Sequence, residues 1–271
     1  MRRSLPRVPG LLCLSISGLS LLSACTVYVP LQGAAPDIRR RGEVEAVGSW
    51  SLSNRFDAAA TYSPLPHVLL RAAASSKNGG YPGRDSTYRL SSQYELGLGT
   101  YWPLGQDWLV GGLVSYGRAH AQARYIDDGD FRLFRRSNFV QHELDARYQL
   151  LSAQGYVSLQ AAPRASFGLA LRLAQLRLTE LTERGQPAPL ATFWQAEPML
   201  FVRLRPAQAP ELVQFQLALG TSASPGYNSR RLDDRADPLR QFRLGSSYIS
   251  VSALLYPHVL WQRKTNRVTQ P

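Results

Sequence analysis

The four histidines are the residues best suited to bind a metal ion or to act as a general base near neutral pH. His67, His120, His142 and His258 are dispersed along the chain, and none belongs to the HExxH pair or a similar pair of zinc ligands. The acidic run Asp127-Asp128-Gly129-Asp130 lacks the remaining ligands and the closing glutamate of an EF-hand loop. We therefore expect no metal site and no cofactor.

A serine activated by a histidine is the other chemistry that these residue types allow, because an imidazole can accept the hydroxyl proton. Ser137 lies between His120 and His142 in the sequence and is the best candidate for such a hydrolase pair. None of the three lies in a diagnostic motif, and a serine-rich chain places some serines near a histidine by chance. We therefore predict that the protein is not an enzyme.

The first 25 residues are similar to the export signal of a bacterial lipoprotein. Arg2 and Arg3 precede an apolar stretch, residues 11–24, that is too short for an ordinary membrane-spanning helix. The stretch ends in Leu22-Ser23-Ala24-Cys25, which resembles a lipobox. This resemblance implies cleavage before Cys25, acylation of its thiol and, with Thr26 in the next position, sorting to the outer membrane.

Export restricts the partners of a basic chain. The net charge is +12, and removal of the three arginines that precede Cys25 leaves +9 on the mature part. Nucleic acid is then not expected as a partner, whereas outer-membrane lipid and anionic sugars or phosphates are. With Cys13 lost with the signal and Cys25 acylated, no disulfide is expected.

Arginine carries nearly all of the positive charge, since Lys77 and Lys264 are the only lysines. Guanidinium groups suit phosphates and carboxylates, so arginine clusters could bind lipid A phosphates or an acidic glycan. The alternative is that they only hold the ends of the structure at the head-group level. The predicted head-group contacts are Arg39, Arg40, Arg41, Arg135 and Arg136.

Alternation of apolar and polar residues with a period of two predicts β-strands through most of the chain after residue 42. In residues 88–102, for example, Leu96 and Leu98 lie on one face and Glu95 on the other. The predicted strands are residues 43–53, 55–63, 67–75, 88–102, 108–117, 156–164, 167–178, 192–205, 211–221 and 242–255. The sequence thus predicts an all-β fold, an antiparallel up-and-down β-barrel of about ten strands, with ten to twelve as the range.

One further segment, residues 138–151, also alternates and would make an eleventh strand. Because bacterial barrels favour even strand numbers, we interpret it as part of an extended outer hairpin or as a continuation of the next strand. The sequence leaves this choice open.

In an outer-membrane barrel the apolar residues face lipid and the polar residues face the lumen, whereas a soluble barrel has the reverse arrangement. Aromatic residues near the predicted strand ends, such as Trp50, Trp102 and Trp194, favour the membrane barrel, because membrane barrels carry aromatic girdles there. The ionisable residues predicted to form a lumen network are Glu45, Arg55, Asp57, Arg71, Arg89, Glu95, Arg172, Glu197 and Arg203.

The order of short motifs resembles a largely uncharacterised lipoprotein family of Bacteroidota with an outer-membrane β-barrel-like domain. The matching stretches are residues 25–30 (CTVYVP), 42–47 (GEVEAV), 56–62 (FDAAATY), 95–103 (ELGLGTYWP), 167–173 (FGLALRL), 197–203 (EPMLFVR) and 213–220 (VQFQLALG). The resemblance spans nearly the whole mature chain and implies a barrel of ten or so strands in the cell envelope. It supplies no substrate and no catalytic residue.

The predicted organisation is a signal peptide (residues 1–24), a lipidated tether (25–42), a β-barrel domain (43–261) and a polar tail (262–271). The leading hypothesis is a non-enzymatic outer-membrane lipoprotein with a structural, adhesive or binding role. The alternatives are a lipid-tethered soluble, lipocalin-like carrier of an apolar ligand, a narrow transport pore and a lipid-modifying outer-membrane enzyme.

Overall fold

The structure, a computed structural model, describes residues 27–80, 87–128, 139–209, 211–227 and 238–261. The predicted signal peptide, Cys25 and the polar tail lie outside these residues, as do Arg135, Arg136 and Ser137.

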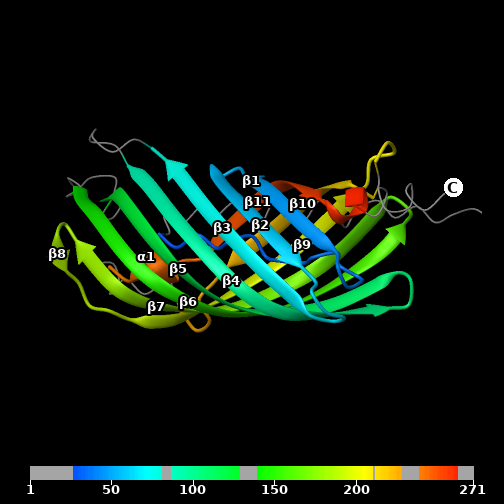
Figure 1. Cartoon of the computed structure of the whole chain (residues 1–271). Coiled ribbons are helices and arrows are strands. Elements are labelled where there is room, and N and C mark those ends of the chain that lie inside the picture. Colours follow the sequence, from blue (N-terminus) through cyan, green and yellow to red (C-terminus); the bar gives the residue numbers. More distant parts are fainter. Residues whose placement is uncertain (1–26, 81–86, 129–138, 210, 228–237, 262–271) are drawn as a thin grey trace, which may run out of the picture.

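Ten antiparallel strands close into one barrel, which confirms the predicted fold class and strand number (Figure 1). Each strand pairs with its neighbours in the chain, and pairing of the first with the last closes the ring. The strands are β1 (Val44–Ser51), β2 (Arg55–Tyr62), β3 (Leu69–Gly79), β4 (Tyr88–Leu104), β5 (Trp108–Asp128), β6 (Phe139–Ala162), β7 (Ala165–Glu183), β9 (Thr192–Leu204), β10 (Val213–Ser222) and β11 (Ser246–Leu255).

Two short elements accompany the wall. The two-residue strand β8 (Gln186–Pro187) pairs only with β7, across a turn in which Arg184 and Gly185 both have positive φ, as a two-residue hairpin turn requires. The helix α1 (Arg240–Arg243) precedes β11. Among the described residues no helix is long and apolar enough to cross a membrane.

The two ends of the barrel differ in the length of their connections. At one end, here the loop end, the strands are joined through residues 80–87, 129–138, 184–191 and 223–245, and by one short turn at 52–54. At the other, here the turn end, the connections are 63–68, 105–107, 163–164 and 205–212. Outer-membrane barrels have short periplasmic turns and longer outer loops, so we assign the loop end, on the left in Figure 1, to the cell surface.

The apolar face of the strands points outward. Leu96, Leu98, Leu200 and Leu217 are 51–65% exposed, whereas Glu95 and Glu197 are buried in the lumen. An outer wall of leucine and valine is stable in lipid and not in water. The soluble-carrier alternative, which required these leucines to line an internal cavity, is therefore wrong.

Aromatic side chains mark both edges of this apolar belt. Between Tyr94 and Trp102 of β4, eight residues of a strand tilted by about 40° span roughly 20 Å along the barrel axis, close to the ~25 Å apolar band of membrane barrels. The loop-end girdle comprises Trp50, Phe56, Tyr94, Tyr116 and Trp194, and the turn-end girdle comprises Tyr62, Trp102 and Trp108.

At the loop-end edge of the belt the polarity of the wall inverts on β5, β6 and β7. Leu150 points into the lumen with 1% exposure, and the next residue, Leu151, points outward with 50% exposure. Beyond this point the outward positions are polar and the inward positions apolar. Since strand geometry does not change, the inversion marks where the wall leaves the bilayer and enters water. One row in register lies at this boundary: Tyr116, Leu151, Gln175 and Trp194.

The inversion decides the question left open for residues 138–151. Residues 139–151 are the first part of β6, which continues without a break to Ala162, so the segment is a continuation of the next strand. Together with β5 and β7 it forms a protruding wall at the loop end, visible on the left in Figure 1. The last strand begins later than predicted, because Phe242 belongs to α1 and β11 starts at Ser246.

Glycine permits close packing on the lumen side of the wall. A Cβ on Gly97 would collide with Ser115 Oγ, and one on Gly111 would collide with the ring of Tyr156. These inward positions are therefore glycine because side chains from neighbouring strands occupy the space.

A charge on the outer wall tests this assignment. We expect Leu98→Arg, near the middle of the belt, to lower the free energy of unfolding in phospholipid vesicles by about 2–4 kcal/mol, because the guanidinium must enter hydrocarbon. Denaturant titration of vesicle-inserted protein measures this change. Leu65→Arg, equally exposed in the turn-end connection, is the control and is expected to change it by less than about 0.5 kcal/mol. Equal effects at the two positions would show that the wall does not face lipid.

The plugged lumen as the candidate functional site

Residues 27–41 run through the lumen from the loop end to the turn end. The sequence interpretation treated residues 25–42 as an irregular tether ahead of the barrel. The described part is indeed without strand or helix, but its side chains are buried inside the wall. We call this segment the plug. Its buried residues are Val27, Tyr28, Val29, Pro30, Leu31, Gln32, Ala34, Ala35, Pro36 and Ile38.

The loop-end layer of the lumen is apolar. Val27 and Tyr28 pack in a cluster with inward residues of the protruding wall, among them Tyr148 and Leu176. Phe242 of α1 is fully buried in the same cluster, and Gln195 Nε2 donates a hydrogen bond to its carbonyl at 2.8 Å. The helix α1 therefore packs in the lumen at the loop end, in the same cluster as the plug.

Below this layer a buried guanidinium joins two carboxylates from different strands. Arg172 Nη2 lies 2.5 Å from Glu95 Oε1, and Arg172 Nη1 lies 3.2 Å from Glu197 Oε2. The plug completes the group, because the Tyr28 hydroxyl donates a hydrogen bond to Glu197 Oε1. All four residues are less than 10% exposed, so this network must satisfy its charges internally.

Backbone carbonyls of the plug accept hydrogen bonds from wall side chains. Arg55, paired with Asp57, donates to the carbonyl of Pro30, and Arg203 donates to that of Ala35. Gln154 of β6 bonds both the amide and the carbonyl of Ala34. An irregular segment can be buried only if its peptide groups find partners, and here wall side chains supply several of them.

A second apolar layer lies toward the turn end. Ala34, Ala35 and Ile38 of the plug pack against inward leucines and aromatic residues of the wall, and Ile38 is fully buried. The wall residues of this layer are Leu69, Tyr101, Leu109, Leu113, Tyr156, Ala170, Met199, Phe201 and Ala218.

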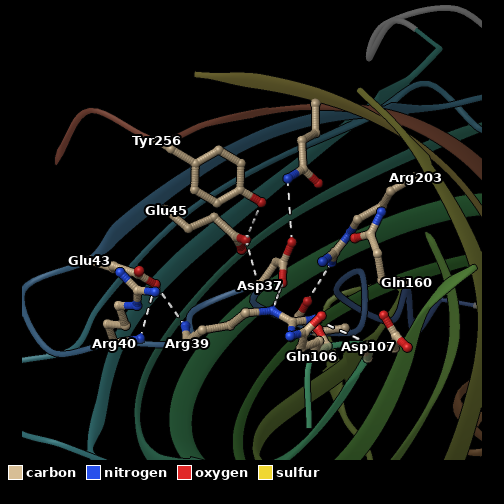
Figure 2. A network of polar contacts seen from close by, with 12 residues as sticks. Asp37, Arg39, Arg40, Glu43, Glu45, Gln106, Asp107, Gln160, Arg203 and Tyr256 are labelled. Atoms are coloured by element: carbon tan, nitrogen blue, oxygen red, sulfur yellow. Dashed lines mark hydrogen bonds and ion pairs between the residues drawn. The ribbon is translucent and has the colours of Figure 1, made fainter. Parts of the chain in front are cut away.

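A cluster of charges fixes the plug at the turn-end rim (Figure 2). Asp37 accepts bonds from Arg39 at 3.2 Å and from Arg205 at 2.8 Å, and its amide donates to Glu45 Oε2 at 2.8 Å. Burial would raise the pKa of Asp37, but Arg203, Arg39 and Arg205 outweigh it and hold that pKa below its ordinary value of 3.8. The Asp37 carboxylate therefore stays charged throughout the physiological range.

The hollows that border the plug are small. The lumen hollows bordered by the plug in the described structure have volumes of about 30 Å³ and about 10 Å³. The larger one has room for one or two water molecules, so neither forms a channel.

The predicted lumen residues all point inward. Glu45, Arg55, Asp57, Glu95, Arg172, Glu197 and Arg203 are buried. Arg71 borders the small lumen hollows, and Arg89 faces inward near the loop end of β4. The sequence did not reveal that the plug and two apolar layers share the lumen with these charges. The apolar content of residues 27–38, high for a solvated tether, was the available signal.

The histidines proposed for a hydrolase pair lie on opposite faces of the wall. His120 points outward and lies 2.8 Å from Asp145, whereas His142 points inward, lies 2.5 Å from Glu183 and stacks on Tyr125. Within the described ranges no three metal-ligating side chains come together.

The predicted head-group arginines divide between two places. Arg40 and Arg41 are exposed at the turn end, while Arg39 donates to the carbonyls of Gln106 and Asp107 in a wall turn. Arg39 therefore holds the plug to the rim. Arg135 and Arg136 lie outside the described residues.

Comparison with known proteins returns matches among solved structures. No family model matches the chain, and no curated protein matches it in sequence. The translocator domain of the autotransporter NalP from Neisseria meningitidis shares 9% identity over 79% of this chain and 86% of that chain, with a TM-score of 0.42. The outer membrane protease OmpT from Escherichia coli shares 9% identity over 79% of this chain and 90% of that chain, with a TM-score of 0.39. An outer membrane channel from Pseudomonas putida F1 shares 11% identity over 83% of this chain and 100% of that chain, with a TM-score of 0.37.

The chain's own surface defines its class. A closed ten-stranded wall, a leucine-rich outer belt and aromatic girdles at both edges are the features of an outer-membrane β-barrel protein. Its lumen is charged and holds residues 27–41 of the same chain.

Removal of the central guanidinium tests the lumen network. We expect Arg172→Met to lower the free energy of unfolding by about 3–5 kcal/mol, because Glu95 and Glu197 then remain as buried carboxylates without their cation. Denaturant titration in detergent micelles measures the loss. Arg147→Met removes an arginine of an exposed ion pair with Glu180 and should change stability by less than about 1 kcal/mol. A loss no larger for Arg172 than for Arg147 would mean that the lumen is hydrated.

Proposed function

We propose that this protein is a non-conducting outer-membrane lipoprotein with a structural, adhesive or binding role at the cell surface. The observation that carries the proposal is the plug, which together with α1 and the lumen side chains fills the interior. In this proposal the protruding wall of β5, β6 and β7 presents the surface available to partners.

The proposal includes acylation at Cys25 and the resemblance to Bacteroidota lipoproteins, both of which come from the sequence. The position of the plug also suggests which membrane leaflet would hold the acyl group of Cys25. Val27 is buried at the loop end, and Cys25 is two residues earlier, within about 7 Å along the chain. An acyl group on Cys25 would therefore belong to the outer leaflet, with the plug threaded through the barrel behind it.

Absence of enzymatic activity is part of the same proposal. His120 and His142 each pair with a carboxylate, but the two point to opposite sides of the wall. We therefore keep the prediction that this protein catalyses no reaction.

A gated pore is the second candidate. The plug is joined to the wall by side-chain contacts and not by strand pairing, so it can leave without breaking the sheet. A charged lumen would remain, with Arg55, Arg172 and Arg203 among its wall residues.

Conductance in planar bilayers separates the two candidates. We expect the wild-type protein to give no stepwise conductance, and a variant lacking residues 27–38 to give discrete channel steps, because only the deletion empties the lumen. Heat-modifiable migration in gels confirms that each protein has folded. Where the deletion does not fold, Tyr28→Ala combined with Asp37→Ala loosens both ends of the plug and serves as the second variant. Steps from the folded wild-type protein would refute the non-conducting proposal and favour the pore.

Mass spectrometry of the mature N-terminal peptide tests the anchor. We expect a diacylglycerol adduct on Cys25 in the wild-type protein and none in Cys25→Ala. The Cys25→Ala barrel should remain in the outer-membrane fraction and stay heat-modifiable, because the leucine belt inserts independently of the lipid. An unmodified mature cysteine, or cleavage elsewhere, would refute the lipoprotein assignment and leave the barrel assignment standing.

A further inference from the structure

Two arginines lie on the outer face of the wall directly above the membrane boundary. Arg118 of β5 and Arg177 of β7 occupy the first outward positions beyond Tyr116 and Gln175. Gln149 of β6 lies between them, and the three residues are in register across the adjacent strands. We call these three residues the arginine row. Their position is the level of lipid head groups in the outer leaflet, given that the loop end faces the cell surface.

The arginine row carries positive charge that the neighbouring protein does not neutralise. Farther out on the same surface, basic side chains have acidic partners: Arg124 with Glu143 at 3.0 Å, His120 with Asp145 at 2.8 Å and Arg147 with Glu180 at 3.4 Å. In the described part of the chain no carboxylate forms an ion pair with Arg118 or Arg177. Arg118 is exposed, and Tyr116 and Tyr94 are the tyrosines beside it at the edge of the belt.

The spacing of the two guanidinium groups suits a phosphate-bearing head group. Two strand spacings separate Arg118 and Arg177, or about 9–10 Å at the backbone. Long arginine side chains can close this distance on one phosphate or hold two groups of one molecule. Guanidinium binds phosphate through paired hydrogen bonds, and the Gln149 amide adds a donor between them.

An apolar hollow lies on the outer wall below the arginine row. It covers β4 to β7, has a volume of about 690 Å³ and has a floor of small residues, Gly112, Ala153 and Gly155. Leucines and valines border it: Leu98, Val114, Leu169, Leu171 and Leu173. Two further hollows of similar volume lie on the outer wall, one over β1–β3, β10 and β11 and one over β1–β6. Of the three, the hollow over β4 to β7 reaches the strands of both arginines, β5 and β7. The combination of cations above and an apolar hollow below is that of a site for one acylated, phosphorylated molecule.

We propose that Arg118, Gln149 and Arg177 bind the phosphate groups of a lipid A-type glycolipid in the outer leaflet, with its acyl chains lying in the hollow below. This site differs from the arginine clusters predicted from the sequence. It requires the surface orientation of the loop end and does not depend on the plug or on acylation of Cys25. The lipid would bind to the outer surface of the barrel and would have no contact with the lumen.

The test measures lipid binding by native mass spectrometry of detergent-solubilised protein titrated with bisphosphorylated lipid A. We expect Arg118→Gln/Arg177→Gln to weaken binding by about tenfold or more, because charge-assisted hydrogen bonds to phosphate are lost. Arg147→Gln, an arginine of the same surface paired with Glu180, is the matched control and should bind within about twofold of wild type. Arg118→Lys/Arg177→Lys keeps the charge without the fork and should fall between the two.

Several outcomes would overturn the proposal. Equal weakening by Arg147→Gln would indicate a diffuse electrostatic effect, and equal affinity for dephosphorylated lipid A would exclude phosphate recognition. Displacement of the lipid by millimolar inorganic phosphate would assign the arginine row to a free anion. Heat-modifiable migration in gels first shows that all variants are folded. Conductance by the wild-type protein would refute the proposed function but would not change the result of the lipid-binding test.

Discussion

The structure depends on one constraint: the apolar face of every strand is committed to lipid, so the polar face must be satisfied inside the barrel. In the described strands, seven acidic or basic residues are buried in the lumen, and ten strands enclose too little space to hydrate them all. A buried charge without a partner costs several kcal/mol, so partners must come from within the chain. The plug supplies many of them. Tyr28 bonds Glu197, the carbonyls of Pro30 and Ala35 accept from Arg55 and Arg203, and Asp37 binds Arg205.

The same constraint explains the layered interior and its reversal at the loop end. Within the bilayer, polar lumen residues alternate with the outer leucines. Beyond the row of Tyr116 and Leu151 the outer face meets water, and the inward positions become alanine, leucine and tyrosine. The protruding wall then packs like a soluble domain, with Val27, Tyr28 and Phe242 as part of its core. A single wall therefore combines a membrane barrel with an extension at its loop end, formed by the same strands β5, β6 and β7.

The sequence allowed the fold to be predicted because alternation with a period of two is a local signal. It located the ten strands and identified the inward charges from Glu45 to Arg203. It also contained the sign of the membrane boundary in the consecutive residues Leu150 and Leu151, where the alternation changes phase. The prediction did not use this change of phase and therefore gave residues 138–151 and 156–164 as two segments, whereas both belong to β6. The plug could not be placed, because contacts such as Tyr28 with Glu197 join residues 169 positions apart and have no local pattern.

The arginine row shows the same distinction between local and long-range information. Clusters such as Arg39 to Arg41 are conspicuous in sequence, yet Arg39 is used to hold the plug to wall turns. Arg118 and Arg177 are isolated in sequence and become neighbours only through the register of β5, β6 and β7. The register between strands decides which side chains become neighbours on the wall, and the periodicity of the sequence does not predict that register.

Hydrogen exchange of the plug amides tests the central claim most directly. In folded protein inserted in lipid, the account predicts that the amides of residues 28–38 exchange as slowly as those of the barrel strands, since the segment is enclosed by the wall. Exchange of these amides within seconds, while the strand amides stay protected, would mean that the segment is a solvated tether and that the lumen charges are satisfied by water.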